Sequence, residues 1–427
     1  EDYIKMVIKA EEERFNKTLD TGLEKFREIT QKLKGNLISG SDAFTLYDTY
    51  GFPPDLTAIL AAEKGLKIDY EGFEKEMQNQ KERARKASKF TLYVNNEDWI
   101  ELSPVTPTSF VGYAKTTGQT YIQRYAVQEK GLILIQLAQT PFYAESGGQV
   151  SDTGKIYNEE FELEITDVRK QDEYIIHYGK LKRGTINNAA VTAEIDIARR
   201  QNIARNHTAT HLLHKALREV LGEHTVQKGS LVHPDYLRFD FAHFKSLTWE
   251  ELRKVEHIVN QAVLDNRKVI TTIKNIEEAK KEGAIALFGE KYSEKVRVVC
   301  VEGFSRELCG GTHISFTGEI GLFKIISESS SAAGIRRIEA ITGISALNWV
   351  EDLHDKLARI SALLNSPIKN IENKLEATLK QISVLEKEIK AAKAGEKERF
   401  VQELLSNATK QEDYLLIKAQ TEFDTLD

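Results

Sequence analysis

Cysteine and long apolar runs are the scarce features of this sequence. Two cysteines among 427 residues cannot build a disulfide framework, and their scarcity favours a reducing compartment, so we expect the protein in the cytoplasm. No apolar run approaches the roughly 20 residues that cross a bilayer, and no signal-peptide pattern opens the chain. We therefore expect no membrane partner. The net charge of -6 argues against a protein that coats nucleic acid without specificity, although it leaves room for local basic patches.

Two short chelating pairs predict a metal site. His207 and His211 stand four residues apart in a run whose apolar residues recur at helical spacing, so both imidazoles project from one face of the expected helix. Cys309 and His313 enclose Gly-Gly-Thr, a tight loop that can turn the thiolate and the imidazole towards a common point. Three imidazoles and a thiolate suit one zinc ion. His214 lies on the same helix face, so spacing alone does not decide which histidines bind the metal.

The period of hydrophobicity changes along the chain and predicts an α+β multidomain fold. Residues 1–90 have the spacing of helices packed on helices, and residues 91–190 alternate with a period of two, which is typical of a small antiparallel β-barrel. Residues 191–346 mix α and β patterns and contain every expected zinc ligand. Residues 347–427 are helical again, and beyond Pro367 they carry the apolar seam of a coiled coil. That seam needs a partner, either within the chain or in a second copy.

Two polar segments are candidates for ligand contact. The stretch 140–154 is too rich in glycine and polar residues for an ordinary strand, so its backbone either approaches a ligand closely or makes a plain hairpin turn. The stretch 80–89 is basic and includes Arg83, Arg85 and Lys86. Most such runs are solvated helix faces, and contact with RNA is the alternative.

Several long motifs carry a family resemblance that covers nearly the whole chain. They include Leu46-Tyr-Asp-Thr-Tyr-Gly-Phe-Pro, Arg205-Asn-His-Thr-Ala-Thr-His-Leu-Leu-His, Glu307-Leu-Cys-Gly-Gly-Thr-His and Ala333-Gly-Ile-Arg-Arg-Ile-Glu-Ala. With these motifs the chain resembles the middle and editing portion of the alanyl-tRNA synthetase family. Free-standing deacylases of the same superfamily share the zinc motifs but lack the helical segments near Glu11 and Leu46. The resemblance to the synthetase is therefore the better match.

The resemblance implies a division of labour along the chain. The helical opening resembles the domain that recognises tRNA(Ala), with Asp48 as a reader of a base edge and the basic run as a second RNA contact. The barrel and the mixed region resemble an editing domain that hydrolyses serine or glycine wrongly esterified to tRNA(Ala). The aminoacylation domain, which uses ATP and Mg²⁺ to attach alanine, would precede Glu1 in this family. We therefore expect this sequence to be an excised piece, with tRNA(Ala) as its partner and self-association through the C-terminal helices as an open alternative.

Three further residues receive catalytic roles by resemblance. Thr210 would recognise the hydroxyl of serine, and Gln227 would hold the ester carbonyl or the attacking water with its amide. Arg336 would bind a terminal phosphate or ribose. Each residue also has an ordinary interpretation: Thr210 packs in a helix, Gln227 lies on the surface, and Arg336 is an ion-pair partner.

The role of zinc itself stays open. Four protein ligands normally close a structural site, whereas hydrolytic zinc keeps one position open. Zinc therefore either activates water or orients the terminal adenosine, and the sequence shows no Glu beside the histidines to act as a general base. Thr208 stands where a zinc protease of the HExxH type carries Glu, which argues against a peptidase. Two other classes remain as alternatives: a non-catalytic RNA-binding module with structural zinc, and an RNA-independent, metal-dependent ester hydrolase.

Overall fold

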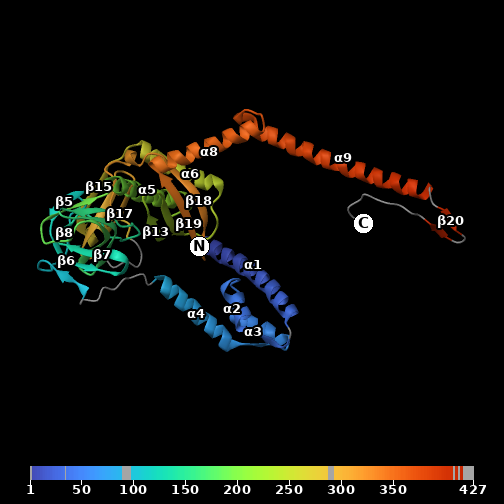
Figure 1. The fold of residues 1–427 in the computed structure, drawn as a ribbon, viewed down its shortest axis with the longest axis horizontal. Helices are drawn as coiled ribbons and strands as arrows, with labels where there is room; N and C mark the ends of the chain where they lie inside the picture. The colour runs from blue at the N-terminus through green and yellow to red at the C-terminus, as the bar shows by residue number, and fades with distance from the viewer. Residues whose placement is uncertain are drawn as a thin grey trace. The chain divides into compact units, whose positions relative to one another are not determined.

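The structure, a computed structural model, describes residues 2–33, 35–88, 98–286, 293–406, 409–411 and 414–416 (Figure 1). The chain forms two compact units, Glu1–Leu347 and Asn348–Asp427. Helices and strands are mixed, and a curled antiparallel sheet occupies the middle of the first unit, so the prediction of a mixed α and β fold is confirmed. Among the described helices, none combines the length and the apolarity that crossing a membrane requires.

The first unit begins with helices, blue in Figure 1, as the three- and four-residue apolar spacing predicts. These are α1 (Asp2–Lys32), α2 (Gly40–Asp48), α3 (Pro54–Glu63) and α4 (Tyr70–Ser88), with strand β1 (Leu37–Ile38) parallel to β2 (Lys67–Ile68). Gly51, with a φ of 63°, and Pro53 separate α2 from α3. Phe26, Leu46 and Phe52 are almost fully buried and form the centre of a core shared by these helices.

An eight-stranded antiparallel sheet follows, and we call it the curled sheet. Its strands lie in the order β3 (Ile100–Glu101), β6 (Ile122–Val127), β7 (Leu132–Leu137), β11 (Tyr174–Arg183), β10 (Glu162–Gln171), β9 (Gly154–Tyr157), β12 (Val191–Ile195) and β5 (Thr117–Thr120). Strands β4 (Ser109–Phe110) and β8 (Gln139–Thr140) form a short parallel pair beside it. Alternate side chains such as Ile135, Leu163 and Ile165 meet in one buried cluster, as the period-two pattern predicts. Closure into a barrel stays a prediction.

His177 of β11 is a fully buried polar residue within the curled sheet. Its Nδ1–H donates to the carbonyl of Ile135 at 3.1 Å, and its Nε2 accepts from the hydroxyl of Thr140 at 2.7 Å. Both ring nitrogens are therefore satisfied in the neutral form. Burial lowers the pKa of His177 to about 4, despite the opposing hydrogen bond to Ile135.

Acidification is expected to destabilise the protein through His177. Its pKa falls from 6.5 to about 4 on folding, so between these values the unfolded chain binds a proton that the folded chain excludes. The stabilisation is complete above pH 6.5 and is lost as the pH falls through 4, by up to about 3 kcal/mol. The measurement is the free energy of unfolding against pH for the wild type and for His177→Gln. The variant should show a shallower slope in this window, and equal slopes would contradict the assignment.

A mixed region completes the first unit and contains two further sheets. The four-stranded sheet has the order β13 (Gln227–Val232), β14 (Leu237–Ala242), β19 (Ile335–Thr342) and β18 (Phe323–Ala332); the three-stranded sheet has the order β15 (Val269–Asn275), β16 (Lys295–Val301) and β17 (Ser305–Leu308). The helices of this region are α5 (Ile197–Leu221), α6 (Trp249–Leu264) and the short α7 (Ile276–Lys281). Leu213 of α5, Val259 of α6 and Phe239 of β14 are fully buried in one shared core. Helix α5 is therefore packed tightly against the four-stranded sheet and can hold side chains rigidly.

Two long helices follow the mixed region: α8 (Gly343–Leu363), which belongs to the second unit from Asn348 onward, and α9 (Ile371–Ser406). A short hairpin of β20 (Thr409–Gln411) and β21 (Tyr414–Leu416) follows. The apolar seam of α9 lies on its surface, with Leu375, Leu379 and Ile389 exposed by 45%, 57% and 57%. The helix that the sequence predicts is present, whereas its pairing in a coiled coil stays a prediction.

Candidate metal centre

Helix α5 positions the first ligand pair. Its N-terminus is capped by Asp196, whose side chain accepts the backbone N–H of Arg199 at 3.0 Å. His207 and His211 lie one helical turn apart on its buried face, with ring centroids 5.4 Å apart and ring planes within 2° of parallel. The prediction from the HxxxH spacing, that both imidazoles project from one face of the helix, is confirmed.

The loop after β17 brings the second pair to the same place. The sulfur of Cys309 lies 3.3 Å from Nε2 of His207 and 3.3 Å from Nε2 of His313. One ligand atom from each of Cys309, His313, His207 and His211 lies within 4.8 Å of the other three. Residues about a hundred positions apart thus converge on one point, as we predicted from their chemistry.

Each imidazole of the cluster has a partner on the nitrogen that faces away from it. The Nδ1–H of His207 donates to Oε1 of Gln149 at 2.8 Å, and Nδ1 of His313 contacts the hydroxyl of Thr208 at 3.1 Å. Nδ1 of His211 lies 2.9 Å from a carboxylate oxygen of Glu307. Such contacts fix the orientation of a metal-ligating histidine and leave Nε2 for the ion.

The donor set fits zinc by two tests. First, Nε2 of His211 is buried, and within the described part of the chain it has no hydrogen-bond partner, which is costly unless a ligand occupies it. Second, sulfur and imidazole nitrogen are the donors that zinc takes in tetrahedral sites. His207, His211, Cys309 and His313 would hold the ion.

Charges at the cluster favour a thiolate. Burial opposes ionisation of Cys309, but the adjacent His207, His313 and His211 lower the pKa of its thiol well below the usual range. Burial lowers the pKa of His313 to about 3, so that this ring is neutral. Burial also opposes charge on His211, yet Glu307 and Cys309 raise the pKa of this imidazole to about 10. A metal ion held by this imidazole would therefore compete with a proton for it.

Two buried residues of this site were missed by the sequence analysis. Gln149, fully buried, contacts His207 and also accepts the backbone N–H of Thr312 at 2.8 Å. Glu307 uses one carboxylate oxygen for His211 and places the other 3.2 Å from Nδ1 of His214. His214 is thus a partner of Glu307, and it is not among the clustered ligands. The only signals in the sequence were the position of Gln149 in the glycine-rich stretch and the position of Glu307 two residues before Cys309.

The glycine-rich stretch makes a tight turn that delivers Gln149. Ser146 and Gln149 pair across the turn, and Gly148 has a φ of 83°. A Cβ on Gly148 would lie 2.4 Å from the hydroxyl oxygen of Ser230, so the turn also packs closely against β13. The stretch is therefore a turn, one of the two sequence interpretations, and its side chain Gln149 contacts His207. Close approach of its backbone to a bound ligand stays a prediction.

The Cys309 loop is held by two residues, Tyr113 from the segment between β4 and β5 and Arg297 from β16. Tyr113 donates its hydroxyl to the carbonyl of Gly310. Arg297 donates to the carbonyls of Cys309 at 3.0 Å and Gly311 at 2.6 Å, and its guanidinium lies 4.3 Å from the centroid of the Tyr113 ring. These contacts fix the backbone that carries the thiolate.

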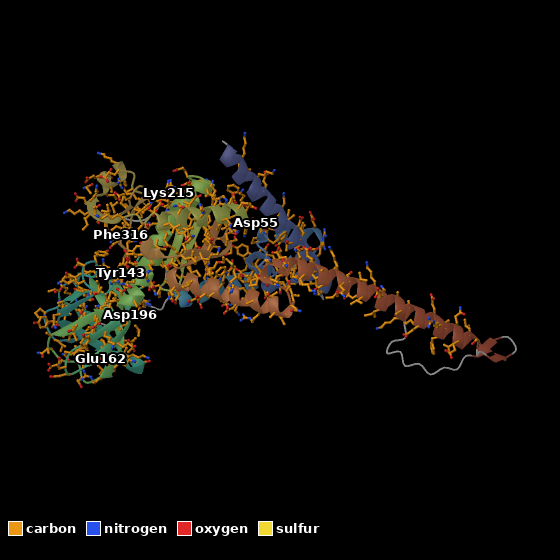
Figure 2. The ribbon with its side chains drawn as sticks, turned by 90° about the horizontal axis from the view of Figure 1, so that it is seen from above. Asp55, Tyr143, Glu162, Asp196, Lys215 and Phe316 are labelled. Atoms are coloured by element: carbon orange, nitrogen blue, oxygen red, sulfur yellow. The ribbon has the colours of Figure 1, made fainter. Side chains whose placement is uncertain are left out.

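Two hollows flank this loop and share Tyr113 as a wall. One, of about 230 Å³, is lined by Arg205, Arg297 and His313 among others. The other, of about 460 Å³, is lined by Gly310 and by aromatic residues that include Tyr143, which Figure 2 labels. A substrate therefore has room beside the cluster on either side of Tyr113.

The three predicted catalytic residues form hydrogen bonds with residues outside the metal cluster. Thr210 donates its hydroxyl to the carbonyl of Asn206 at 2.8 Å within α5. The amide of Gln227 donates to Ser230 at 3.2 Å, and Arg336 donates to Glu328 at 2.6 Å. Through Phe241 of β14, Gln227 and Arg336 occupy one row of paired residues across the four-stranded sheet. Their catalytic roles stay predictions.

The predicted RNA contacts lie in the helical opening. Asp48 is at the end of α2, and its carboxylate accepts the side-chain amide of Gln80 from α4. Arg83, Arg85 and Lys86 belong to α4, but their side chains lie outside the described residues. RNA contact by these four residues stays a prediction.

Comparison with known proteins gives consistent matches. Residues 1–199 match the family model described as tRNA synthetases class II (A), and residues 296–339 match the second additional domain of threonyl and alanyl tRNA synthetases. An alanine–tRNA ligase of Thermoanaerobacter sp. (strain X514) is 44% identical over 404 residues, which are 92% of this chain and 46% of that protein. An alanine–tRNA ligase of Colwellia psychrerythraea (strain 34H) is 45% identical over 398 residues, 90% of this chain and 45% of that protein. The chain spans about half the length of the curated relatives it matches.

Proposed function

Because the chain belongs to the alanyl-tRNA synthetase family, we propose that it is the part of an alanine–tRNA ligase that recognises tRNA(Ala) and removes wrongly attached serine or glycine. The observation that carries the proposal is the convergence of His207, His211, Cys309 and His313 beside two hollows. Attachment of alanine with ATP and Mg²⁺ would belong to an aminoacylation domain outside this chain. The cytoplasm is the compartment that we propose for it.

A second site of this kind has a physical reason. A pocket that accepts alanine cannot exclude glycine, which is smaller, and it rejects an added hydroxyl poorly. A difference of one small group supplies only about 1–3 kcal/mol of discrimination. Accurate pairing of alanine with its tRNA therefore requires hydrolysis of the errors at another site.

The side chains around the cluster suggest which step of ester hydrolysis each group would assist. Zinc held there would polarise an ester carbonyl or a bound water. The Glu307 carboxylate, which lies 2.9 Å from His211 and 3.2 Å from His214, is engaged in holding imidazoles. It is therefore a poor candidate for a general base, and water would have to be held by an amide or hydroxyl such as that of Gln227 or Thr210. This supports an orienting role for the metal at least as well as direct activation of water.

A second candidate function is favoured by the closed ligand set. Four protein donors within 4.8 Å of one another can satisfy a tetrahedral ion completely, as in structural zinc sites. A non-catalytic RNA-binding module would keep this geometry and would not hydrolyse the ester.

Hydrolysis of charged tRNA(Ala) distinguishes these functions. We expect the zinc-loaded chain to hydrolyse Ser-tRNA(Ala) and Gly-tRNA(Ala) at least about 10-fold faster than Ala-tRNA(Ala), since one group separates the substrates. A strong chelator should abolish this hydrolysis, and added zinc should restore it. Equal rates on correct and incorrect tRNAs would contradict proofreading. Binding of tRNA(Ala) without hydrolysis of any of them would favour the RNA-binding module.

A further inference from the structure

An aromatic hollow lies directly beside the metal centre and has no part in holding the metal. Its walls include Phe110, Tyr113 and Tyr143, its volume is about 460 Å³, and Lys170 lies at its rim. The ring of Phe110 is nearly perpendicular to the ring of Tyr113, and their centroids are 4.9 Å apart. The centroid of the Phe110 ring lies 6.0 Å from that of Tyr143. We call this cavity the aromatic hollow.

The aromatic hollow is physically continuous with the loops that carry the zinc ligands. Gly310 lines it and follows Cys309 directly, so their Cα atoms are only about 3.8 Å apart. Tyr113 donates its hydroxyl to the carbonyl of Gly310. Tyr143 is only 7% exposed and donates to the carbonyl of Ser146, in the turn that delivers Gln149 to His207. A molecule in the hollow would therefore contact the metal-binding loop itself, at the residue next to Cys309.

We propose that the aromatic hollow binds the terminal adenosine of the aminoacylated tRNA, with its base against Phe110 and Tyr113 and its ribose ester directed past Gly310 to the metal centre. The proposal deepens the proposed function and rests on it. It assigns the hollow to a purine nucleoside, and it makes Tyr113 both a wall for the base and a support for the Cys309 loop.

The size and chemistry of the hollow fit this occupant better than the hollow on the other side of Tyr113. Small-molecule sites typically have about 300–1,000 Å³, a range that includes the 460 Å³ of the aromatic hollow but not the 230 Å³ of its neighbour. In the smaller hollow, Arg200 is engaged with Asp152 and Arg297 with loop carbonyls. Bases stack on aromatic side chains whatever their sequence.

The charged residues at the rim of the hollow are suited to the terminal nucleoside of an RNA strand. The exposed Lys170 offers an ammonium group to a phosphate, whereas the neighbouring Asp172 and Glu173 repel phosphates and can accept ribose hydroxyls. A rim of mixed charge is unsuited to a continuous RNA backbone. It suits a single nucleoside that enters while the preceding phosphates stay outside.

Fluorescence of a base analogue tests the proposal. The probe is a hairpin RNA that copies the acceptor stem of tRNA(Ala) and carries 2-aminopurine in place of the terminal adenine, whose fluorescence falls on stacking. We expect quenching when the zinc-loaded full chain binds the probe. Tyr113→Leu should lose the quenching and raise KM for deacylation by about 5- to 100-fold with a smaller change in kcat.

Three variants separate stacking from other effects. Tyr113→Phe keeps the ring and should restore the quenching that Tyr113→Leu loses. Tyr121→Leu removes a tyrosine that is 57% exposed elsewhere on the curled sheet, and it should behave like the wild type. Zinc content is measured for every variant. If Tyr113→Leu also loses zinc, Phe110→Leu is the deciding variant, because among the described residues the ring contacts of Phe110 are with Tyr113 and Tyr143 and not with the Cys309 loop.

The outcomes of the two proposals are distinct. Hydrolysis of Ser-tRNA(Ala) by the wild type, with the same quenching and KM in Tyr113→Leu and Phe110→Leu, would overturn the aromatic hollow as the adenosine site. Quenching that depends on these rings, without hydrolysis by the wild type, would overturn the proposed function and leave the nucleoside site intact.

Discussion

Cys309→Ala is expected to leave the protein folded but almost free of zinc. The Cys309 sulfur is the only anionic donor of the cluster, and it lies 3.3 Å from two imidazole nitrogens. Loss of a partner that merely orients a ligand typically costs 10–100-fold in metal affinity. Loss of the thiolate itself should therefore weaken zinc binding by at least about 100-fold. Deacylation of Ser-tRNA(Ala) should fall by a similar factor. The measurements are zinc per chain by elemental analysis and the deacylation rate.

Cys300→Ala is the matched control for this prediction. Cys300 is the other cysteine of the chain and lies in β16, paired with Ile270 and Arg306 on the neighbouring strands. It should keep one zinc ion per chain and nearly unchanged deacylation. The ligand assignment would be wrong if Cys309→Ala also retained one tightly bound zinc ion.

The clustering of the four candidate ligands was predictable from one local pattern together with donor chemistry. Helical spacing alone placed His207 and His211 on one face of α5, and the structure has them there with parallel rings. Cys309 and His313 were joined to them by donor chemistry rather than by any pattern, since 102 residues separate Cys309 from His207. A short list of metal-binding side chains, in a chain with two cysteines and ten histidines, made that step possible.

The partners that orient the ligands were not predictable from the sequence. Gln149 and Glu307 have no spacing that marks them, and they reach His207 and His211 only because the glycine-rich turn and the end of β17 lie against α5. The ambiguity of His214 had the same origin. Its helical position matches that of a ligand, and only its contact with Glu307 shows that its role is different. Such contacts depend on tertiary packing, which local periodicity does not contain.

Prediction of the fold was likewise limited to what local periodicity contains. The period-two pattern indicated antiparallel strands in the middle of the chain, but β7 is buried on both sides, so alternation there does not report which face meets the core. The apolar seam of α9 was visible as a heptad-like spacing, whereas its partner was not, because a seam specifies a surface and leaves the occupant open.

Gly311→Ala is expected to damage the metal centre through one methyl group. Gly311 is not among the residues with positive φ, so its backbone would tolerate alanine. An added Cβ, however, would lie 2.0 Å from Cε1 and 2.3 Å from Nδ1 of His207, and 2.7 Å from Oε1 of Gln149. His207 would have to leave its position between Gln149 and Cys309. Zinc affinity should fall by about 10- to 100-fold, which is the loss typical when a residue that orients a metal ligand is removed.

Gly310→Ala provides a control within the same loop, because a Cβ at Gly310 meets nothing within 4 Å. Zinc affinity, measured for both variants by competition with a chromophoric chelator, should be nearly that of the wild type for Gly310→Ala and much weaker for Gly311→Ala. Both variants add one methyl group to the loop and remove one glycine, so general stiffening of the backbone cannot explain a difference between them. Equal affinities would mean that His207 does not hold the ion, and the cluster would then have to bind it through the other three side chains.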